Sequence, residues 1–124
     1  MWFKKNNVDK AFKSFNFLIE YGFTLKRYHR APDEERVYSQ SNIVIEVDYF
    51  WGVYPDYTKN MRVDVIIKVD EYRNNLLESD KIFNAELLES LKTEINAVTP
   101  LEQIPIYADF IKTNINSLLQ HKKD

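Results

Sequence analysis

The alternation of side chains over residues 43–70 constrains the fold of this chain more than any other feature. Odd-numbered residues are β-branched or aromatic over 43–51 and again over 63–69, whereas most even-numbered neighbours are charged. A period of two in such residues is typical of a half-buried strand. We therefore expect two antiparallel strands, joined by an aromatic loop at residues 51–60, whose odd-numbered face is covered by other elements.

Helical periodicity flanks this pair of strands on both sides. A helix is predicted over residues 7–21, with Gly22 as its left-handed C-terminal cap and Phe23 as the apolar contact that follows such a cap. A second is predicted from the N-cap Asn84 to residue 98, and a third from residue 104 to residue 120, with Pro105 separating it from a short turn at residues 99–102. The apolar stripes of these three helices consist of Val8, Ala11, Phe12, Phe15, Leu18 and Ile19; Leu87, Leu88, Leu91, Ile95 and Val98; and Tyr107, Ile111, Ile115 and Leu118.

The region between the first helix and the long strands predicts two shorter strands. These cover residues 23–29 and 35–39, with turns at 31–34 and 40–42. Short connections join antiparallel neighbours, so the sheet is expected to be a four-stranded antiparallel meander. The predicted fold class is α+β, a single domain over residues 1–124 with an N-terminal helix, the meander, and two C-terminal helices packed on the sheet.

Composition excludes several classes of protein. The chain has no cysteine, which rules out disulfides, thiolate metal sites and a cysteine nucleophile. No window of about 18 consecutive apolar residues is present, and no apolar run of the signal-peptide kind follows Met1. We expect a cytoplasmic protein that does not enter a membrane.

Motifs for catalysis or cofactor binding are also absent from the sequence. His29 and His121 are the only histidines, and neither has a spaced metal-ligand partner. No serine lies in a nucleophile-elbow context, and two glycines cannot form a glycine-rich phosphate loop. The expectation is a protein without catalytic residues, metal or cofactor.

Three carboxylates leave an enzymatic alternative open. Glu46, Asp48 and Asp64 are expected to share one face of neighbouring strands, where they could form a metal cluster or an acid/base pair in a small metal-dependent hydrolase. In the other interpretation, Arg62 and Lys68 form cross-strand ion pairs with these acids on a solvated face.

The expected partner-binding residues are aromatic. Trp51, Tyr54 and Tyr57, with Asp56 as a polar contact, lie in a loop longer than a hairpin needs. The alternative is that this loop forms a lid over the core. Phe17 and Tyr21 fall opposite the stripe of the first helix, and they indicate either an exposed patch or a helix packed on two sides.

A third possibility is nucleic-acid binding through the N-terminal region, which carries seven basic and two acidic residues among its first 30. The basic residues are Lys4, Lys5, Lys10, Lys13, Lys26, Arg27 and Arg30, with Trp2 and Phe3 available to stack on bases. The overall net charge of −2 argues against this function, because the acidic remainder of the chain would repel a polyanion.

Residues 12–50 also resemble a known group of proteins. The run Phe15-x-Phe17-Leu18-Ile19-Glu20-Tyr21-Gly22-Phe23, followed by Val37-Tyr38-Ser39 and Ile43-x-Ile45-x-Val47-x-Tyr49, is similar to a pattern in small uncharacterised bacterial proteins, some of which resemble toxin-immunity proteins. The resemblance transfers no catalytic residue. It implies a non-catalytic protein that binds and blocks a protein partner, such as a toxin.

Overall fold

The fold is an antiparallel sheet with helices on one side. The computed structural model describes residues 2–30, 33–50 and 61–123, with side chains from Asn7 onward. Its elements, in chain order, are α1 (Trp2–Phe12), η1 (Lys13–Phe15), α2 (Phe17–Glu20), β1 (Thr24–Arg30), β2 (Asp33–Gln40), β3 (Ile43–Phe50), β4 (Arg62–Val69), β5 (Tyr72–Asn75), η2 (Leu76–Glu78), α3 (Ala85–Asn96), α4 (Pro100–Thr113) and α5 (Ile115–Leu119), where η denotes a short 3₁₀ helix.

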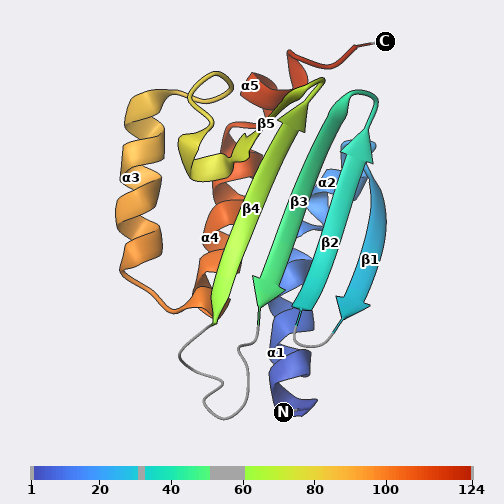
Figure 1. The fold of residues 1–124 in the computed structure, drawn as a ribbon, viewed down its shortest axis with the longest axis vertical. Helices are drawn as coiled ribbons and strands as arrows, with labels where there is room; N and C mark the ends of the chain where they lie inside the picture. Colours follow the sequence, from blue (N-terminus) through green and yellow to red (C-terminus); the bar gives the residue numbers. More distant parts are fainter. Residues whose placement is uncertain (1, 31–32, 51–60, 124) are drawn as a thin grey trace.

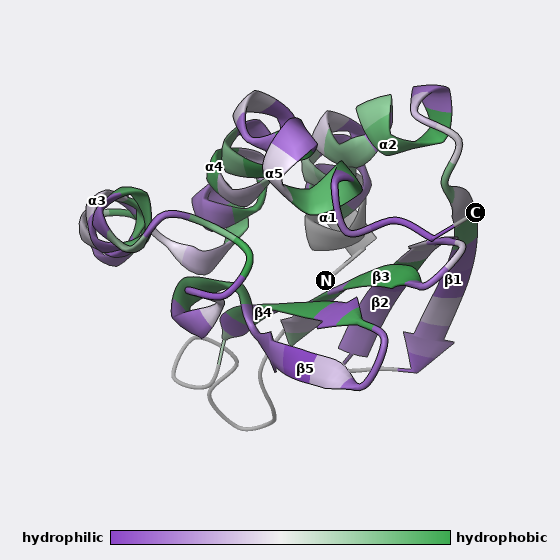
Figure 2. Ribbon diagram, turned by 90° about the horizontal axis from the view of Figure 1, so that it is seen from above, coloured by the Kyte–Doolittle hydropathy of each residue, from purple (hydrophilic) through white to green (hydrophobic). Residues whose placement is uncertain are grey.

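The sheet is a meander in the order β1-β2-β3-β4-β5, with all neighbours antiparallel. Helices α1, α2, α4 and α5 form a single layer behind it in Figure 1, and the view from above shows the two layers separated (Figure 2). Helix α3 lies beyond the β4–β5 side of the sheet, next to α4. The α+β class is confirmed.

The long strands follow the predicted alternation. Every odd-numbered residue of β3 from Ile43 to Tyr49 is buried, as is every odd-numbered residue of β4 from Val63 to Val69. These side chains face the helix layer and form the centre of the core with the stripe Ile104, Tyr107, Ile111, Ile115 and Leu118. The even-numbered residues face away from the helices, so the other side of the sheet carries the polar half of the pattern.

The prediction of four strands was wrong, because β5 is a fifth. Its four residues are polar and show no alternation of apolar side chains, so periodicity could not reveal it. The strand exists because the chain reverses tightly after β4, where Asp70 adopts a positive φ of 56°, and then pairs with β4 from Tyr72 to Asn75. The short 3₁₀ helix η2 follows directly, from Leu76.

The N-terminal helix also differs from the prediction. The α-helix stops at Phe12, and three residues of 3₁₀ helix precede α2. A 3₁₀ turn uses about 3.0 residues instead of 3.6, which rotates the following residues relative to a continuous α-helix. Phe17 is therefore buried at 8% exposure, whereas Ile19, predicted in the stripe, is 49% exposed.

Gly22 ends α2 as predicted. Its N–H donates to the carbonyl of Ile19 and the N–H of Phe23 to that of Leu18, both at 3.0 Å, which is the Schellman pattern. Gly22 has a φ of +96°, and a Cβ there would lie 2.6 Å from the side-chain amide nitrogen of Gln40.

Replacing Gly22 with alanine should lower the free energy of unfolding by about 1 kcal/mol, mainly because a Cβ disfavours this left-handed backbone. A urea melt measures the loss. Serine-to-alanine replacement at exposed Ser90 serves as the control, and an unchanged midpoint for Gly22→Ala would contradict the assignment of this cap.

Helix α3 begins as predicted, whereas α4 begins at Pro100 and not at residue 104, and the helix predicted to continue to residue 120 is divided at Asn114 into α4 and α5. The Oδ1 of Asn84 accepts hydrogen bonds from the first turn of α3, and the Glu102 carboxylate accepts from the N–H and hydroxyl of Thr99 at the start of α4. The interruption predicted at Pro105 is wrong. Proline removes one backbone donor, and burial of Ile104 and Tyr107 on either side of it favours a continuous helix.

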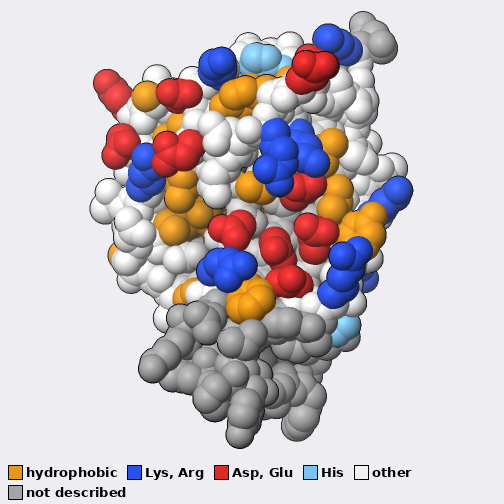
Figure 3. Space-filling view, viewed as in Figure 1, with side chains coloured by type: hydrophobic (Ala, Val, Ile, Leu, Met, Phe, Trp, Pro, Cys, Tyr) orange, Lys and Arg blue, Asp and Glu red, His pale blue; other side chains and the backbone are white. Residues whose placement is uncertain are grey.

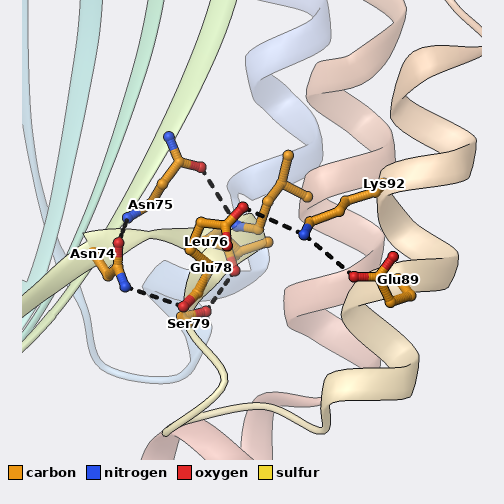
Figure 4. A network of polar contacts seen from close by, with 8 residues as sticks. Asn74, Asn75, Leu76, Glu78, Ser79, Glu89 and Lys92 are labelled. Carbon is orange, nitrogen blue, oxygen red and sulfur yellow. Dashed lines mark hydrogen bonds and ion pairs between the residues drawn. The ribbon is translucent and has the colours of Figure 1, made fainter.

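Helix α3 contacts the rest of the protein through η2 as well as α4 (Figure 4). The ammonium of Lys92 lies 3.3 Å from carboxylate oxygens of both Glu78 and Glu89. Asn74 and Ser79 fold their side chains onto backbone carbonyls of η2. Because α3 lies at the edge of the sheet, Leu88 and Leu91 are buried but Leu87, which was predicted in the stripe, is 45% exposed.

Candidate functional site: the open face of the sheet

The face of the sheet turned away from the helices presents carboxylates in adjacent strands. Register places Tyr28 opposite Glu35, Glu35 opposite Asp48, and Asp48 opposite Asp64. The next cross-strand row contains Arg30, Asp33, Phe50 and Arg62. We call the side chains of Asp33, Glu35, Asp48 and Asp64 the acidic cluster; in Figure 3 acidic groups gather over β2–β4 in this part of the face.

Basic residues neutralise only part of this face. Glu46 lies 2.9 Å from the ammonium of Lys68 and 3.8 Å from the guanidinium of Arg73, while Asp64 lies 3.3 Å from Arg62. The cross-strand pair predicted for Lys68 is therefore confirmed with Glu46, whereas Arg62 pairs with Asp64 inside β4 and not across strands as predicted. Within residues 2–30, 33–50 and 61–123, neither Asp33, Glu35 nor Asp48 forms an ion pair.

Asp48 lies at the centre of the uncompensated charge. Its pKa is raised to about 6, mainly by partial burial and in addition by the charges of Asp33, Glu35 and Asp64, while the guanidinium of Arg62 acts to lower it. One carboxylate oxygen of Asp48 and one of Asp33 are buried and accept no hydrogen bond from the described residues. Like charges opposite one another on neighbouring strands destabilise a sheet, so this arrangement opposes folding at neutral pH.

A small recess of about 100 Å³ lies at the β1 side of the acidic cluster, lined by Tyr28, Arg30, Asp33, Glu35 and Asp48. Its size suits the end of one side chain, such as an ammonium or guanidinium group. A drug-sized ligand usually occupies a cleft of about 300 Å³ or more. The recess therefore fits a contact within a larger interface.

The metal-cluster form of the enzymatic alternative can be compared with the geometry. Among the described residues, no group of three or more His, Cys, Asp and Glu side chains is arranged to hold a metal ion. Glu46, which was considered as a ligand, is bound to Lys68 and lies one cross-strand row away from Asp48 and Asp64. The structure brings Asp48 and Asp64 together, and adds Asp33 and Glu35.

Phe17 and Tyr21, which were also predicted as partner-binding residues, do not join this face. Trp51, Tyr54, Asp56 and Tyr57 lie outside the described residues, so they stay predictions. Phe17 is buried in the helix layer with the Lys112 ammonium 5.9 Å from its ring centroid. Tyr21, which is 43% exposed, packs edge-on against Phe17 at 6.2 Å between ring centroids.

Sequence reasoning missed Asp33 as a site residue because residues 31–34 were assigned to a turn, and missed Glu35, the first residue of the strand predicted over 35–39, because its cross-strand partner depends on the β2–β3 register. Strand β2 begins at Asp33 instead, which aligns the two acids with Phe50 and Asp48. The signal available in the sequence was the run Asp33-Glu34-Glu35 immediately before a strand. Only the register shows that its first and third members share the face of Asp48.

No protein-family model matches the chain, and no curated protein or solved structure was found to be similar to it. Its function is therefore inferred from the residues of the site. Within the described residues, none of the helices has the length and apolar character required to cross a membrane.

Proposed function

We propose that this protein is a non-catalytic binding module that docks a basic surface of a protein partner on the open face of its sheet. The observation that carries the proposal is the charge of Asp33, Glu35 and Asp48, which no described residue pairs, on a face that no described element covers. A partner's arginine and lysine side chains would complement this charge. They would also relieve the repulsion that the free protein sustains at neutral pH.

The surroundings of the acidic cluster suit a protein surface better than an isolated ion. Tyr28, Val37, Phe50 and Ile66 flank the carboxylates on the same face and supply partly exposed apolar area. Protein interfaces combine such apolar contacts with charged pairs at defined positions. A polyanion such as nucleic acid would be repelled here.

The resemblance over residues 12–50 suggests a specific form of this function. In this form the protein is an immunity protein that neutralises a toxin by covering a basic surface of it. Neighbouring genes give an inexpensive test of that form. A secreted toxin encoded beside this protein supports it, whereas a metabolic operon counts against it. The docking proposal itself is tested on the isolated protein.

The test uses a basic octapeptide of alternating lysine and alanine as the probe. Titration at low salt, followed by amide NMR shifts, should perturb the open face of β1–β4 with an affinity that falls as salt rises. The variant Asp33→Asn/Glu35→Gln/Asp48→Asn should bind at least tenfold more weakly. Lowering the pH from 7.5 to 5 should also weaken binding by the wild type, because Asp48 takes up a proton as the pH passes about 6.

The matched control removes three charges elsewhere. Glu86, Glu89 and Glu94 are exposed acids of α3, and their conversion to glutamine changes the net charge by the same amount. Binding should then change less than twofold. Equal loss in both triple variants would reject a specific site, and tighter binding of Mg²⁺ than of the peptide at the same residues would favour the metal-dependent alternative.

A further inference from the structure

A second recess lies on the opposite side of β1 and β2, between these strands and the segment α1–η1. It encloses about 200 Å³, and its lining includes the charged side chains of Asp9, Lys13, Arg27 and Arg36. Phe12, Leu25 and Tyr38 supply apolar walls, and the amide of Asn16 completes the lining. We call this recess the basic cleft.

Arg36 forms the inner end of the basic cleft. Its side chain is 6% exposed, its guanidinium donates to the carboxylates of Glu34 and, at 3.1 Å, Asp9, and it lies 4.5 Å from the ring centroid of Phe12. Glu34 and Asp9 thus each accept from one of the two terminal nitrogens of the guanidinium, and the Phe12 ring packs against it. Its charge is therefore balanced within the protein.

Lys13 and Arg27 are different, because neither forms an ion pair with any described residue. Arg27 stands directly opposite Arg36 in the sheet, so two guanidinium groups occupy neighbouring positions on one face. Because Glu34 and Asp9 already compensate Arg36, the guanidinium of this pair that is available to an external anion is that of Arg27. Across Lys13, Arg27 and Arg36, with Asp9 and Glu34, one positive charge remains uncompensated.

We propose that the basic cleft binds a small molecule that carries a phosphate or carboxylate group on a short apolar body. Arg27 offers a planar fork of donors that matches two oxygens of such a group, and Lys13 adds a point charge from the opposite wall. The Asn16 amide provides a neutral donor. Leu25, Phe12 and Tyr38 then contact the apolar body, which distinguishes this ligand from a free inorganic ion.

The electrostatics at Tyr38 agree with this arrangement. Burial raises the pKa of its phenol to about 12, while the charges of both Arg36 and Arg27 act to lower it. Both guanidinium groups are therefore close enough to act on the phenol that lines the cleft. Its wall is positive as well as partly apolar.

The basic cleft is not continuous with the other cationic side chains, so it does not form an extended surface that could bind a nucleic-acid backbone. Lys26 and Arg30 alternate with Arg27 along β1 and therefore point to the acidic face of the sheet. The members of the basic set whose side chains the structure describes are thus split between two faces, and among them only Lys13 and Arg27 line this cleft. An isolated cationic recess of this size suits a small anion.

The experiment titrates phenyl phosphate, benzoate and inorganic phosphate separately into the full-length protein and follows amide NMR shifts. Phenyl phosphate should perturb residues around Lys13, Asn16, Arg27 and Tyr38, and should bind at least fivefold more tightly than inorganic phosphate. Benzoate binding as tightly as phenyl phosphate would assign a carboxylate ligand, and weaker benzoate binding a phosphate ligand. Either result supports the site.

Two pairs of variants supply matched controls. Arg27→Gln should weaken binding of the tighter probe at least tenfold, whereas Lys26→Gln, the adjacent cation on the other face, should change it less than twofold. Lys13→Gln and Lys10→Gln form the second pair on the helix side. All four residues are exposed, so the variants should keep the wild-type melting midpoint.

Three results would overturn the proposal: no saturable binding of any probe at millimolar concentration, equal losses in Arg27→Gln and Lys26→Gln, or shifts scattered over the surface. The outcome is independent of the docking test. The basic octapeptide and the organic anions report on opposite faces of the sheet, and the variants share no residue.

Discussion

Replacing Arg36 with methionine is expected to lower the free energy of unfolding by about 3–5 kcal/mol at pH 7.5. The reason is the charge that the substitution leaves behind. Glu34 is 4% exposed and faces the helix layer, where Arg36 and the ring of His29 supply its hydrogen bonds. Removing one partner of a buried ion pair costs about this much, because the remaining charge is desolvated without compensation.

A urea melt measures the effect, and Arg27→Met is the matched control. Arg27 is opposite Arg36 on the same face of the sheet but is exposed, so its replacement should change stability by about 0.5 kcal/mol or less. The double variant Glu34→Leu/Arg36→Met should recover most of the loss, since it removes both charges. If the double variant is less stable than Arg36→Met alone, the loss arises from packing against Phe12 and not from the stranded carboxylate.

The same pair predicts a pH dependence. Burial alone would raise the pKa of Glu34, but the hydrogen bonds and charges of Arg36 and His29 outweigh burial and lower it. In the wild type this group therefore contributes stability above its ordinary pKa, which is lost as the pH falls through the lowered value. Without Arg36, burial dominates and Glu34 takes up a proton more readily. The difference between wild type and Arg36→Met should accordingly be smaller at pH 4.5 than at pH 7.5.

Strand pairing and helix starts could be predicted from particular residues. The alternation from Ile43 to Val69 specified which side chains of β3 and β4 are buried, and Gly22, Asn84 and Thr99 marked helix boundaries by local backbone chemistry. These signals are local, or repeat with a fixed period. They survive in the fold because burial and hydrogen bonding act on them directly.

Helix phase and the inward side of β2 could not be predicted, because tertiary contacts determine them. The 3₁₀ segment η1 changes which residues of α2 face the core, and no composition signal marks it. Strand β2 buries Glu34 and Arg36 where an apolar pair would be expected from its position. Their burial is stable because each charged group meets the other, a compensation that depends on Asp9 in α1 and His29 in β1.

The acidic cluster was half predictable for a similar reason. Asp48 and Asp64 occupy even positions of two well-patterned strands, so their common face followed from the alternation. Asp33 and Glu35 join them only through the β2–β3 register, which the turn at Ser41 sets with a positive φ of 54°. A slip of one residue would have turned both acids into the core.

Asp48→Asn is expected to raise the free energy of unfolding by about 1–2 kcal/mol at pH 7.5. This gain is smaller than the pKa shift alone would give, because solvent screens the charge of this partly exposed group. The folded-state pKa of about 6 lies above the ordinary value of 3.8, so the folded protein binds more protons than the unfolded chain between these values. Stability should therefore fall as the pH rises from 3.8 to 6. The gain from Asp48→Asn should shrink as the pH falls below 6 and disappear near pH 4.

Urea melts of Asp48→Asn at pH 7.5, 5.5 and 4 test this expectation. The control is Asp80→Asn, which makes the same chemical change at an exposed residue that forms no ion pair among the described residues. A pH-independent gain would attribute the effect to packing and contradict the proposed repulsion. The decisive comparison combines stability with binding. If the carboxylate serves a cationic partner, the substitution that stabilises the free protein should weaken its binding of the basic octapeptide at pH 7.5. Opposite signs in the two measurements would indicate that Asp48 destabilises the free fold and serves the docking surface.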